Sequence, residues 1–383
     1  MINVLHVADK LTLGDSSIHG VTQLFSMWLP RFDETRYNVS LCSLRTRDSG
    51  GAYLEEKGIR VFYLNKGKFD PLTLTDLLRL VRKENVHILH LHGYGSTTFG
   101  RICANLTGIP SIVHEHMFDE NIPFYQQFAD RLLSRATTGA IAVSQSVKEF
   151  LVRYRSVPVT KINVIYNGVP LATYSPRREV TSTTRIEASW KSRLNIPESH
   201  MVVGTVGRLH SIKGHKYFLE AAEQVLKEFT NVSFLVIGDG ELMLALRDRC
   251  SELGIEASVI FTGHCDDVPS LLSEVDVKVI ASLSEGVPIT LFEAMAAGCA
   301  IVSTNVGGIG EVLVDGQTGF LVPPKSSNDL AEKMLILLRN PSLCKKMGMQ
   351  AQEASLQYDI GNTVRQFEDI YEQIHRDCSR NGK

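Results

Sequence analysis

The sequence predicts an α/β protein of two domains, each built on a parallel β-sheet. Its length of 383 residues exceeds what one hydrophobic core usually serves. Short apolar runs typical of buried strands alternate along the chain with segments of helical periodicity, which is the pattern of parallel strands joined by crossover helices. A hydrophobic content of 44% and a charged content of 21% are those of an ordinary globular protein.

The first domain is predicted over residues 1–170. Its strands are expected near 2–8, 37–43, 59–64, 86–91, 111–115, 139–143 and 162–165. Helices fit between these strands, for example over 72–84, where Leu74, Leu77, Leu78 and Val81 recur at helical spacing. The alternation of strand and helix is therefore continuous through this half of the chain.

The pattern stops after Pro170 and resumes about thirty residues later. Residues 171–200 contain prolines, a Thr/Ser cluster and several charges, and are predicted to be the connection between the domains. The second domain is predicted over 201–360. Its strands are expected at 201–206, 232–237, 258–262, 277–280 and 300–302, and the tail from 327 is expected to be helical.

Two carboxylates stand eight positions apart, at Glu285 and Glu293, on either side of a predicted helix start. Pro288 fits the first helical position because it has no amide hydrogen to leave unbonded, and Gly298 fits the C-terminal stop, so the helix is predicted over about 288–297. Its start would present the free backbone N–H groups that follow Gly286, namely those of Val287, Ile289, Thr290 and Leu291. Such groups, with the positive end of the helix dipole, form an anion site.

Each carboxylate can accept hydrogen bonds from a pair of hydroxyls on opposite sides of that anion. Sugar, diphosphate and ribose occur in this order in a nucleotide diphosphate sugar, so the segment suits such a ligand. The alternative for the pair alone is that Glu285 offsets the helix dipole and Glu293 lies on a solvated outer face.

A second anion-binding element is predicted where the strand at 201–206 breaks at Gly207. The loop that follows carries Arg208 and Lys213, spaced to converge across it. Arginine supplies a planar fork of donors and lysine a compact charge, a combination suited to two phosphate groups. A solvated loop without a ligand is the alternative for this motif on its own.

Taken together, these motifs resemble the donor half of the retaining glycosyltransferases of family 4. The residues that carry the resemblance are Gly207-Arg208, Lys213-Gly214, Phe261-Thr262-Gly263, Glu285-Gly286-Val287-Pro288, Glu293-Ala294, Val306-Gly307-Gly308, Glu311 and Gly319. The resemblance is dense from about 201 to 324 and thinner over the rest of the chain. It implies two Rossmann-like domains facing across a cleft, the GT-B arrangement, with the last helix, here about 361–377, crossing back onto the first domain.

The resemblance also implies an activity, the transfer of a hexose or N-acetylhexosamine from a nucleotide diphosphate sugar with retention of configuration. UDP is the favoured nucleotide and GDP the next. The acceptor would be a glycan, a lipid-linked glycan or a small molecule, as in the synthesis of cell-surface glycans or glycolipids. Neither a metal nor another cofactor is expected, and no nucleic acid. A nucleotide-sugar epimerase of the same fold and a non-catalytic nucleotide-sugar-binding relative stay open as alternatives.

In the expected mechanism, negative charge grows on the diphosphate as it leaves the sugar. Arg208, Lys213 and the start of the helix would stabilise that charge. Glu285 and His116 are expected to position the sugar through its hydroxyls, and Glu293 to hold the ribose. His116 matches the family's cleft histidine by its distance from Pro110, although His114 would face the same way on a strand.

Two further loops of the first domain follow strand ends, where ligands of α/β sheets bind. Relatives often place a Gly-Gly pair at the first of these loops, and here the pair is His19-Gly20, which leaves Gly20 as the candidate for donor binding. In the second loop, His90 and His92 point the same way from a strand and would suit a metal pair. No further ligand cluster accompanies them in the sequence, so a packed strand end is the better interpretation.

The compartment is predicted from cysteines and from apolar runs. Seven scattered cysteines without a Cys-x-x-Cys pair argue against a disulfide framework and a zinc site. Met1 leads directly into the first strand without a signal sequence, and no apolar run reaches the length of a membrane span. We therefore expect a cytoplasmic protein.

Contact with the inner face of the membrane is a further expectation. Residues 1–170 carry 19 Lys and Arg against 15 Asp and Glu. The aromatic segment 124–128 is followed by basic residues at Arg131, Arg135, Arg153 and Arg155, which would help the domain rest on an anionic surface. Solvated helix faces are the alternative for these charges.

Overall fold

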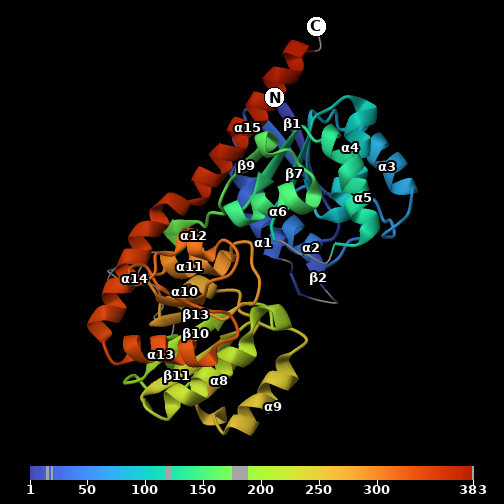
Figure 1. Ribbon diagram of the computed structural model, residues 1–383. Helices are drawn as coiled ribbons and strands as arrows, with labels where there is room; N and C mark the ends of the chain where they lie inside the picture. Colours follow the sequence, from blue (N-terminus) through green and yellow to red (C-terminus); the bar gives the residue numbers. More distant parts are fainter. Residues whose placement is uncertain (14–16, 19, 118–121, 175–188, 382–383) are drawn as a thin grey trace, which may run out of the picture. The chain divides into compact units, whose positions relative to one another are not determined.

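The structure is a computed structural model that describes residues 1–13, 17–18, 20–117, 122–174 and 189–381. The chain forms two compact units (Figure 1). Unit 1 comprises Met1–Gly168 with Ile360–Lys383, and unit 2 comprises Val169–Asp359. Each unit is an α/β structure around a parallel sheet, which confirms the predicted fold class of two Rossmann-like domains.

Unit 1 contains a seven-stranded parallel sheet in the order β5-β4-β1-β6-β7-β8-β9. Its strands are β1 (Ile2–Ala8), β4 (Tyr37–Ser43), β5 (Val61–Tyr63), β6 (Ile88–His92), β7 (Ser111–Glu115), β8 (Gly139–Ala142) and β9 (Ile162–Val164). A small antiparallel pair, β2 (Thr12–Leu13) and β3 (Ser17–Ile18), follows β1. All seven predicted strands of this half are present, within about two residues of their predicted limits.

The helices of unit 1 cover both faces of this sheet. They are α1 (Gly20–Trp28), α2 (Ser49–Glu56), α3 (Leu72–Lys83), α4 (Tyr94–Thr107), α5 (Phe124–Leu133), α6 (Gln145–Arg155) and α15 (Ile360–Asn381), with short 3-10 turns at Leu29–Arg31, Ser134–Ala136 and Val159–Lys161. One core joins Leu5 and Leu91 of the sheet to Leu77 of α3 and Cys103 of α4. Side chains alternate along a strand, so the residues between these, His6 and the β6 histidines among them, face the other way.

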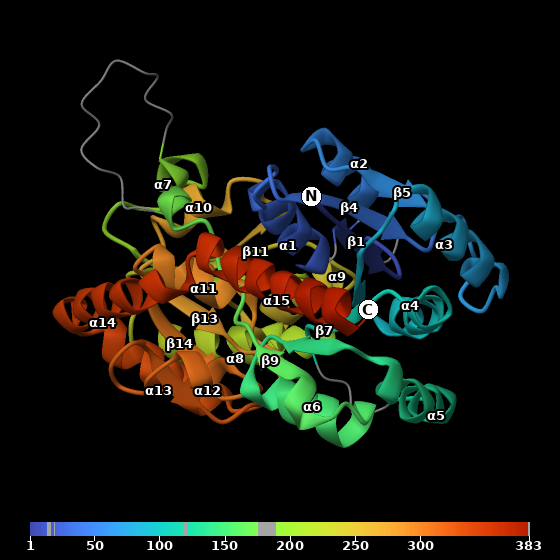
Figure 2. The same ribbon diagram turned by 90° about the horizontal axis from the view of Figure 1, so that it is seen from above.

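Helix α15 closes that second face (Figure 2). Its Phe367 and Tyr371 are completely buried, and Phe367 lies edge-on to Trp28 of α1 with ring centres 5.1 Å apart. The hydroxyl of Tyr37 donates to the carbonyl of Glu368 at 3.1 Å. The predicted final helix therefore packs on the N-terminal unit, through aromatic residues spaced at i and i+4.

A buried ionic network ties α4, α5 and α6 to the end of β7. Asp130 of α5 accepts hydrogen bonds from Arg101 of α4 and from Arg155 of α6, and Arg155 also donates to Glu115 of β7 at 2.5 Å. Arg155 is 1% exposed, so the expectation that it belongs to a membrane-facing basic surface is wrong. Helical periodicity explains the error, because Arg155 lies one turn beyond Leu151 on the apolar face of α6.

Unit 2 contains a six-stranded parallel sheet in the order β12-β11-β10-β13-β14-β15. Its strands are β10 (Met201–Val206), β11 (Val232–Ile237), β12 (Val259–Gly263), β13 (Val277–Ile280), β14 (Ala300–Thr304) and β15 (Phe320–Val322). The five predicted strands are present, and β15 was not predicted. A three-residue strand at the edge of a sheet is too short to show a hydrophobic period.

The helices of unit 2 surround this sheet. They are α7 (Trp190–Arg193), α8 (His215–Leu226), α9 (Met243–Leu253), α10 (Val268–Leu272), α11 (Ile289–Ala296), α12 (Ile309–Val312), α13 (Ser327–Leu338) and α14 (Pro341–Ser355), with 3-10 turns at Leu171–Thr173, Ser211–Lys213, Glu256–Ser258 and Leu356–Tyr358. The core joins Phe234 and Val279 of the sheet to Phe218 of α8 and Met334 of α13.

The expected connection at 171–200 is partly described, since residues 175–188 lie outside the described part of the chain. Its described ends pack on unit 2. Tyr174 donates to Glu293 at 2.9 Å, and the backbone N–H of Trp190 donates to Glu274 at the same distance. The domain limits drawn from the sequence remain predictions.

We expect Asp130→Ala to destabilise unit 1 by about 3–5 kcal/mol, because it leaves two buried guanidinium groups without their shared carboxylate. Urea denaturation followed by the fluorescence of Trp28, in a Trp190→Phe background, measures this change. Arg131→Ala is the matched control, since its side chain is exposed on the same helix and its removal should change stability by no more than about 0.5 kcal/mol. Equal effects of the two substitutions would contradict the network's role.

Candidate functional site

The loop after β10 turns at two glycines that other residues cannot replace without strain. Gly207 has a φ of +156° and Gly214 a φ of +65°, and a Cβ at Gly214 would lie 2.0 Å from the carbonyl oxygen of Ala281. Between them, the 3-10 turn Ser211–Lys213 sets the position of Lys213. The backbone of this loop is held by the imidazole of His215, which hydrogen-bonds the carbonyl of Arg208 at 3.1 Å.

Helix α11 begins one residue later than predicted. Pro288 is extended, with φ −70° and ψ 134°, so it is the residue before the helix rather than its first residue. Gly298, with a φ of +74°, ends the helix as predicted. Both residues thus mark the ends of the helix for the physical reasons that the sequence suggested.

Three of the four predicted amides at this helix start are available to a ligand. Among the described residues, the backbone N–H groups of Val287, Ile289 and Thr290 have no hydrogen-bond acceptor. The N–H of Leu291 instead donates to the carbonyl of Pro288 at 3.0 Å, so the expectation that it is free is wrong. The first turn closes early with an i to i−3 bond, as helix ends commonly do.

Lys213 and the start of α11 flank one small crevice. Thr205, Val206, Lys213, Glu285 and Thr290 are among the residues that line it. The ammonium of Lys213 donates to the carboxylate of Glu285 at 2.6 Å, and the hydroxyl of Ser282 donates to the same oxygen at 2.7 Å. An ammonium has three donors, so Lys213 can hold Glu285 and a phosphate oxygen together.

The loop after β14 packs closely against the backbone of Glu285 and Gly286. The N–H of Gly308 donates to the carbonyl of Gly286 at 2.6 Å. Gly307 has a φ of +57°, and a Cβ there would lie 1.7 Å from the carbonyl oxygen of Glu285. The Gly307-Gly308 pair was recognised by resemblance alone, and close backbone approach is its physical reason.

Glu293 is buried inside unit 2, which excludes the alternative that it lies on a solvated face. The residue is 2% exposed, and its carboxylate accepts a hydrogen bond from the hydroxyl of Tyr174 at 2.9 Å. Burial raises the pKa of Glu293. Burial also raises the pKa of Tyr174 far above its usual range, so this hydroxyl remains a donor.

Lys278 was not predicted as a site residue. It lies fully buried on β13 and interacts electrostatically with Glu293, Lys213 and Glu285. Its ammonium donates to the carbonyl of Val279 at 3.2 Å, and burial lowers its pKa to about 7. The signal was present, because a lysine within the otherwise apolar strand Val277–Ile280 departs from the usual pattern of a central parallel strand.

The remaining donor-side candidate is Arg208, which is partly exposed. Its guanidinium makes no hydrogen bond or ion pair with the described residues. It is therefore available to an anion, although its convergence with Lys213 remains a prediction.

In unit 1, Gly20 is the first residue of α1, and a Cβ at this position would meet no atom within 4 Å. Sterics within unit 1 therefore do not require a glycine, and its donor-binding role remains a prediction. His19 lies outside the described residues.

Five histidines of unit 1 form a cluster that was not predicted. His6 joins the four residues His90, His92, His114 and His116, and two groups of three in this cluster offer ring nitrogens within 4.8 Å of one another. The expectation that no further ligands accompany His90 and His92 is therefore wrong. β1 lies between β4 and β6, a neighbour relation that strand periodicity alone does not give.

Within this cluster, His114 and His116 face the same way, as strand alternation predicted, and their rings stack with centres 4.2 Å apart. His114 is 1% exposed, whereas His116 is only partly buried. Glu115 points to the opposite side, where it binds Arg155. Of the two histidines, His116 is the one with access to solvent.

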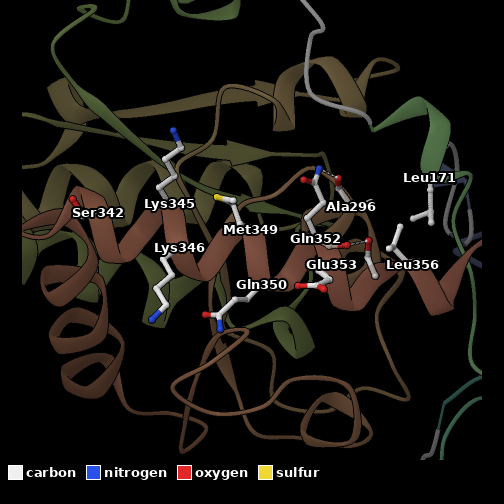
Figure 3. A pocket seen from close by; sticks show the side chains of 11 residues that line it. Leu171, Ala296, Ser342, Lys345, Lys346, Met349, Gln350, Gln352, Glu353 and Leu356 are labelled. Carbon is white, nitrogen blue, oxygen red and sulfur yellow. Dashed lines mark hydrogen bonds between the residues drawn. The ribbon is translucent and has the colours of Figure 1, made fainter.

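Another hollow of unit 2 lies along α14 (Figure 3). It has a volume of about 790 Å³, and its labelled side chains include Lys345, Met349 and Gln352. Gln352 is occupied with the carbonyl of Ala296 at 2.9 Å. This hollow contains neither the crevice residues nor a group of converging polar side chains, so we do not assign the donor to it.

Comparisons with known proteins agree on one family. The model described as glycosyl transferases group 1 matches residues 187–354, and the model described as glycosyltransferase family 4 matches residues 19–173. The chain is 28% identical, over 66% of each chain, to a UDP-Gal:alpha-D-GlcNAc-diphosphoundecaprenol alpha-1,3-galactosyltransferase of Escherichia coli. It is 30% identical to an N-acetyl-alpha-D-glucosaminyl L-malate synthase of Bacillus anthracis, over 59% of this chain and 57% of that protein. The chain thus spans less than two thirds of the length of these relatives.

Solved structures match over nearly the whole chain. A glycosyltransferase from Rickettsia africae superposes with a TM-score of 0.84 at 20% identity, covering 97% of this chain and 98% of that one. HepE of Anabaena, solved in complex with UDP, superposes with a TM-score of 0.80 at 20% identity, covering 97% and 100%. Together these matches establish the fold.

We expect Gly307→Ala to destabilise unit 2, because the added Cβ would overlap the carbonyl of Glu285. The loss should be about 1–3 kcal/mol larger than the strain of placing an alanine at a positive φ. Gly254→Ala is the matched control, since Gly254 has a φ of +66° with nothing within 4 Å of an added Cβ. Urea denaturation followed by circular dichroism compares the two variants. If they lose the same stability, the close approach of the two loops is not a constraint.

Proposed function

This chain belongs to family 4 of the glycosyltransferases and has the GT-B fold, and we propose that it transfers a sugar with retention from a nucleotide diphosphate sugar to an acceptor hydroxyl. A UDP-sugar is the favoured donor and a GDP-sugar the next. The Escherichia coli relative, named as a UDP-Gal galactosyltransferase that acts on a diphosphoundecaprenol-linked sugar, supports both a UDP donor and a lipid-linked acceptor. A role in cell-surface glycan or glycolipid synthesis follows from that choice of acceptor.

One observation carries this proposal. Lys213 and Thr290 line the same crevice, and the backbone amides of Thr290 and of the preceding Ile289 are unbonded among the described residues. A diphosphate there would meet a full positive charge on one side and the positive end of a helix on the other. Arg208, which has no anionic partner among the described residues, adds a second full charge.

These groups act on the transition state for transfer. As the bond from the anomeric carbon to the phosphate oxygen breaks, negative charge grows on the diphosphate, and the crevice stabilises that charge. The acceptor oxygen forms the new bond to the anomeric carbon, and its proton passes to the departing phosphate on the same face of the sugar. This order of events retains the configuration without a nucleophile from the protein.

The two carboxylates of the motif have distinct surroundings. Glu285 is bound by Lys213 and Ser282, yet a carboxylate has about four acceptor positions, so it can also receive sugar hydroxyls. The hydrogen bond from Tyr174 restricts the orientation of the Glu293 carboxylate. We assign Glu293 to the ribose hydroxyls of the donor. For His116 we propose a hydrogen bond to a sugar hydroxyl.

We also propose that unit 1 contacts an anionic membrane through an aromatic patch, defined as Phe69, Phe124, Tyr125, Phe128 and Leu132. These side chains are 70%, 83%, 52%, 57% and 62% exposed. The ring centres of Phe69 and Tyr125 lie 5.9 Å apart, so the segment after β5 contacts α5. The exposed cations Lys68, Arg131 and Arg135 lie next to the patch in sequence. Apolar side chains beside cations are typical of surfaces that bind anionic bilayers.

No described helix is long and apolar enough to cross a bilayer.

We expect Lys213→Ala to reduce the transfer rate by about 10²–10³, because it removes one charge from the leaving group. Rates measured with a panel of UDP- and GDP-sugars test the loss. In a thermal-shift assay, a donor at 100 times its dissociation constant should stabilise the parent protein by about 2.7 kcal/mol. Lys216→Ala, an exposed lysine on α8, is the control and should keep both signals. Near-normal turnover of Lys213→Ala would remove this residue from the site.

We expect Phe124→Ser with Phe128→Ser to weaken binding to vesicles that contain anionic lipid by at least about tenfold, since each phenylalanine contributes roughly 1.5 kcal/mol or more when buried. Sedimentation with anionic and with neutral vesicles measures the binding. Leu244→Ser is the control, because Leu244 is 76% exposed but lies on α9 of unit 2. Binding that does not depend on the patch, or no binding to anionic vesicles, would exclude this surface.

A further inference from the structure

The carboxylate of Glu285 lies beside Lys213, whose ammonium group is assigned to the leaving diphosphate. That ammonium donates to Oε1 of Glu285 at 2.6 Å. A phosphate oxygen bound by the same ammonium would lie within about 3.2 Å of its nitrogen. The phosphate oxygen and Oε1 would then be at most about 6 Å apart. Glu285 therefore carries a negative charge next to the position of an anion.

Glu285 is fixed in this position from several sides. Its carbonyl oxygen lies 1.7 Å from where a Cβ at Gly307 would be, so the two backbones are in close contact. The hydroxyl of Ser282 donates to the same Oε1 at 2.7 Å. The side chain of Glu285 is 11% exposed, against 29% for Lys213. Water and salt screen a partly buried charge much less than an exposed one, so this charge acts on an anion in the crevice.

The sugar donor and the nucleotide product carry different charges. In a nucleotide diphosphate sugar both phosphates are esterified, and each carries one negative charge. Transfer of the sugar frees the terminal phosphate, which can then lose a further proton near about pH 6, as a phosphate monoester does. At pH 8 the product therefore carries about one more negative charge than the donor. A fixed carboxylate beside the diphosphate repels the product more strongly than the donor.

The donor also has an attraction that the product lacks. In the proposed function, hydroxyls of the transferred sugar donate to Glu285. A carboxylate has about four acceptor positions, and Lys213 and Ser282 take two of them, both at Oε1. The free nucleoside diphosphate has no such hydroxyls. The same carboxylate thus attracts the sugar of the donor and repels the diphosphate of the product.

We propose that Glu285 discriminates against the free nucleoside diphosphate, so that its charge beside Lys213 speeds release of the product from the crevice. This inference rests on the proposed function, because it takes the crevice of unit 2 as the diphosphate site. It differs from sugar binding alone in what it predicts. If Glu285 only bound sugar hydroxyls, the loss of its charge would weaken binding of the donor and leave binding of UDP unchanged.

Glu285→Gln tests the inference, because it removes the charge and keeps the shape. The two hydrogen bonds enter the same oxygen, and the amide oxygen of glutamine can accept both. We expect the variant to bind UDP, GDP and pyrophosphate at least about fivefold more tightly than the parent protein at pH 8 and low salt. Isothermal titration calorimetry measures the Kd values. The gain should be smaller for UDP-galactose and UDP-N-acetylglucosamine, which carry one negative charge fewer.

Two further variants separate the effect of charge from other causes. Glu228→Gln is the matched control for net charge, since Glu228 pairs with Arg339 at an exposed position beyond the end of α8. It should leave every Kd within about twofold of the parent value. Ser282→Ala removes a neutral hydrogen bond to the same oxygen of Glu285 and should not tighten binding of UDP. Tightening by Ser282→Ala equal to that by Glu285→Gln would contradict the role of charge.

Lys278 is a second cation that acts on Glu285. Burial lowers the pKa of Lys278 to about 7, and the charge of Glu285 raises it. Loss of that charge would favour release of the proton from Lys278 and offset part of the gain in affinity. The comparison is therefore repeated in a Lys278→Met background, where Glu285→Gln should tighten binding of UDP by at least the same factor.

The outcomes distinguish this inference from the proposed function. If the parent protein binds UDP, Lys213→Ala binds it more weakly, and folded Glu285→Gln binds it no more tightly, the inference is overturned and the diphosphate site stands. If the parent protein binds none of the three anions, or if binding does not depend on Lys213, the diphosphate site is contradicted and the inference fails with it. Where transfer is detected, the inhibition constant of UDP should fall in Glu285→Gln by the same factor as its Kd.

Discussion

Positive charge converges on the crevice of unit 2, and the rest of that unit holds it in place. Lys213 and the dipole of α11 both direct positive charge into it, and among the described residues Glu285 supplies the carboxylate that binds Lys213, at 2.6 Å. A helix start with unbonded amides beside an ammonium group favours an anion, and the proposed diphosphate carries the charge that suits it. The glycines at 214 and 307 permit the close backbone contacts that keep these elements together.

Buried polar groups recur in both units. Unit 1 has the histidine cluster and the Asp130 network, and unit 2 has Lys278 on β13 and Glu293 on α11. These groups add little to stability, because their desolvation offsets most of the energy of their mutual contacts. Their value is geometric, since a fully bonded network admits few side-chain arrangements. Sites that must orient a sugar hydroxyl or a phosphate oxygen need that restriction.

Much of the fold was predictable because strand and helix periods are local properties of the sequence. Glu285, Gly298 and Lys213 were identified from helix-end and turn chemistry, which is also local. Tyr174 and His6 were missed because their significance arises from the order of strands and from contacts between segments far apart in the chain. Lys278 was missed although a lysine within the apolar strand Val277–Ile280 is a local signal. The helical spacing of Arg155 from Leu151 places it on the apolar face of α6, but only its partners on α5 and β7 explain why a charge is buried there.

A crystal structure with a nucleoside diphosphate such as UDP tests the central claim most directly. The account predicts phosphate oxygens within about 3.2 Å of the amides of Ile289 and Thr290 and of the ammonium of Lys213. A bound nucleotide whose phosphates lie outside this crevice, with those amides still unbonded, would contradict it.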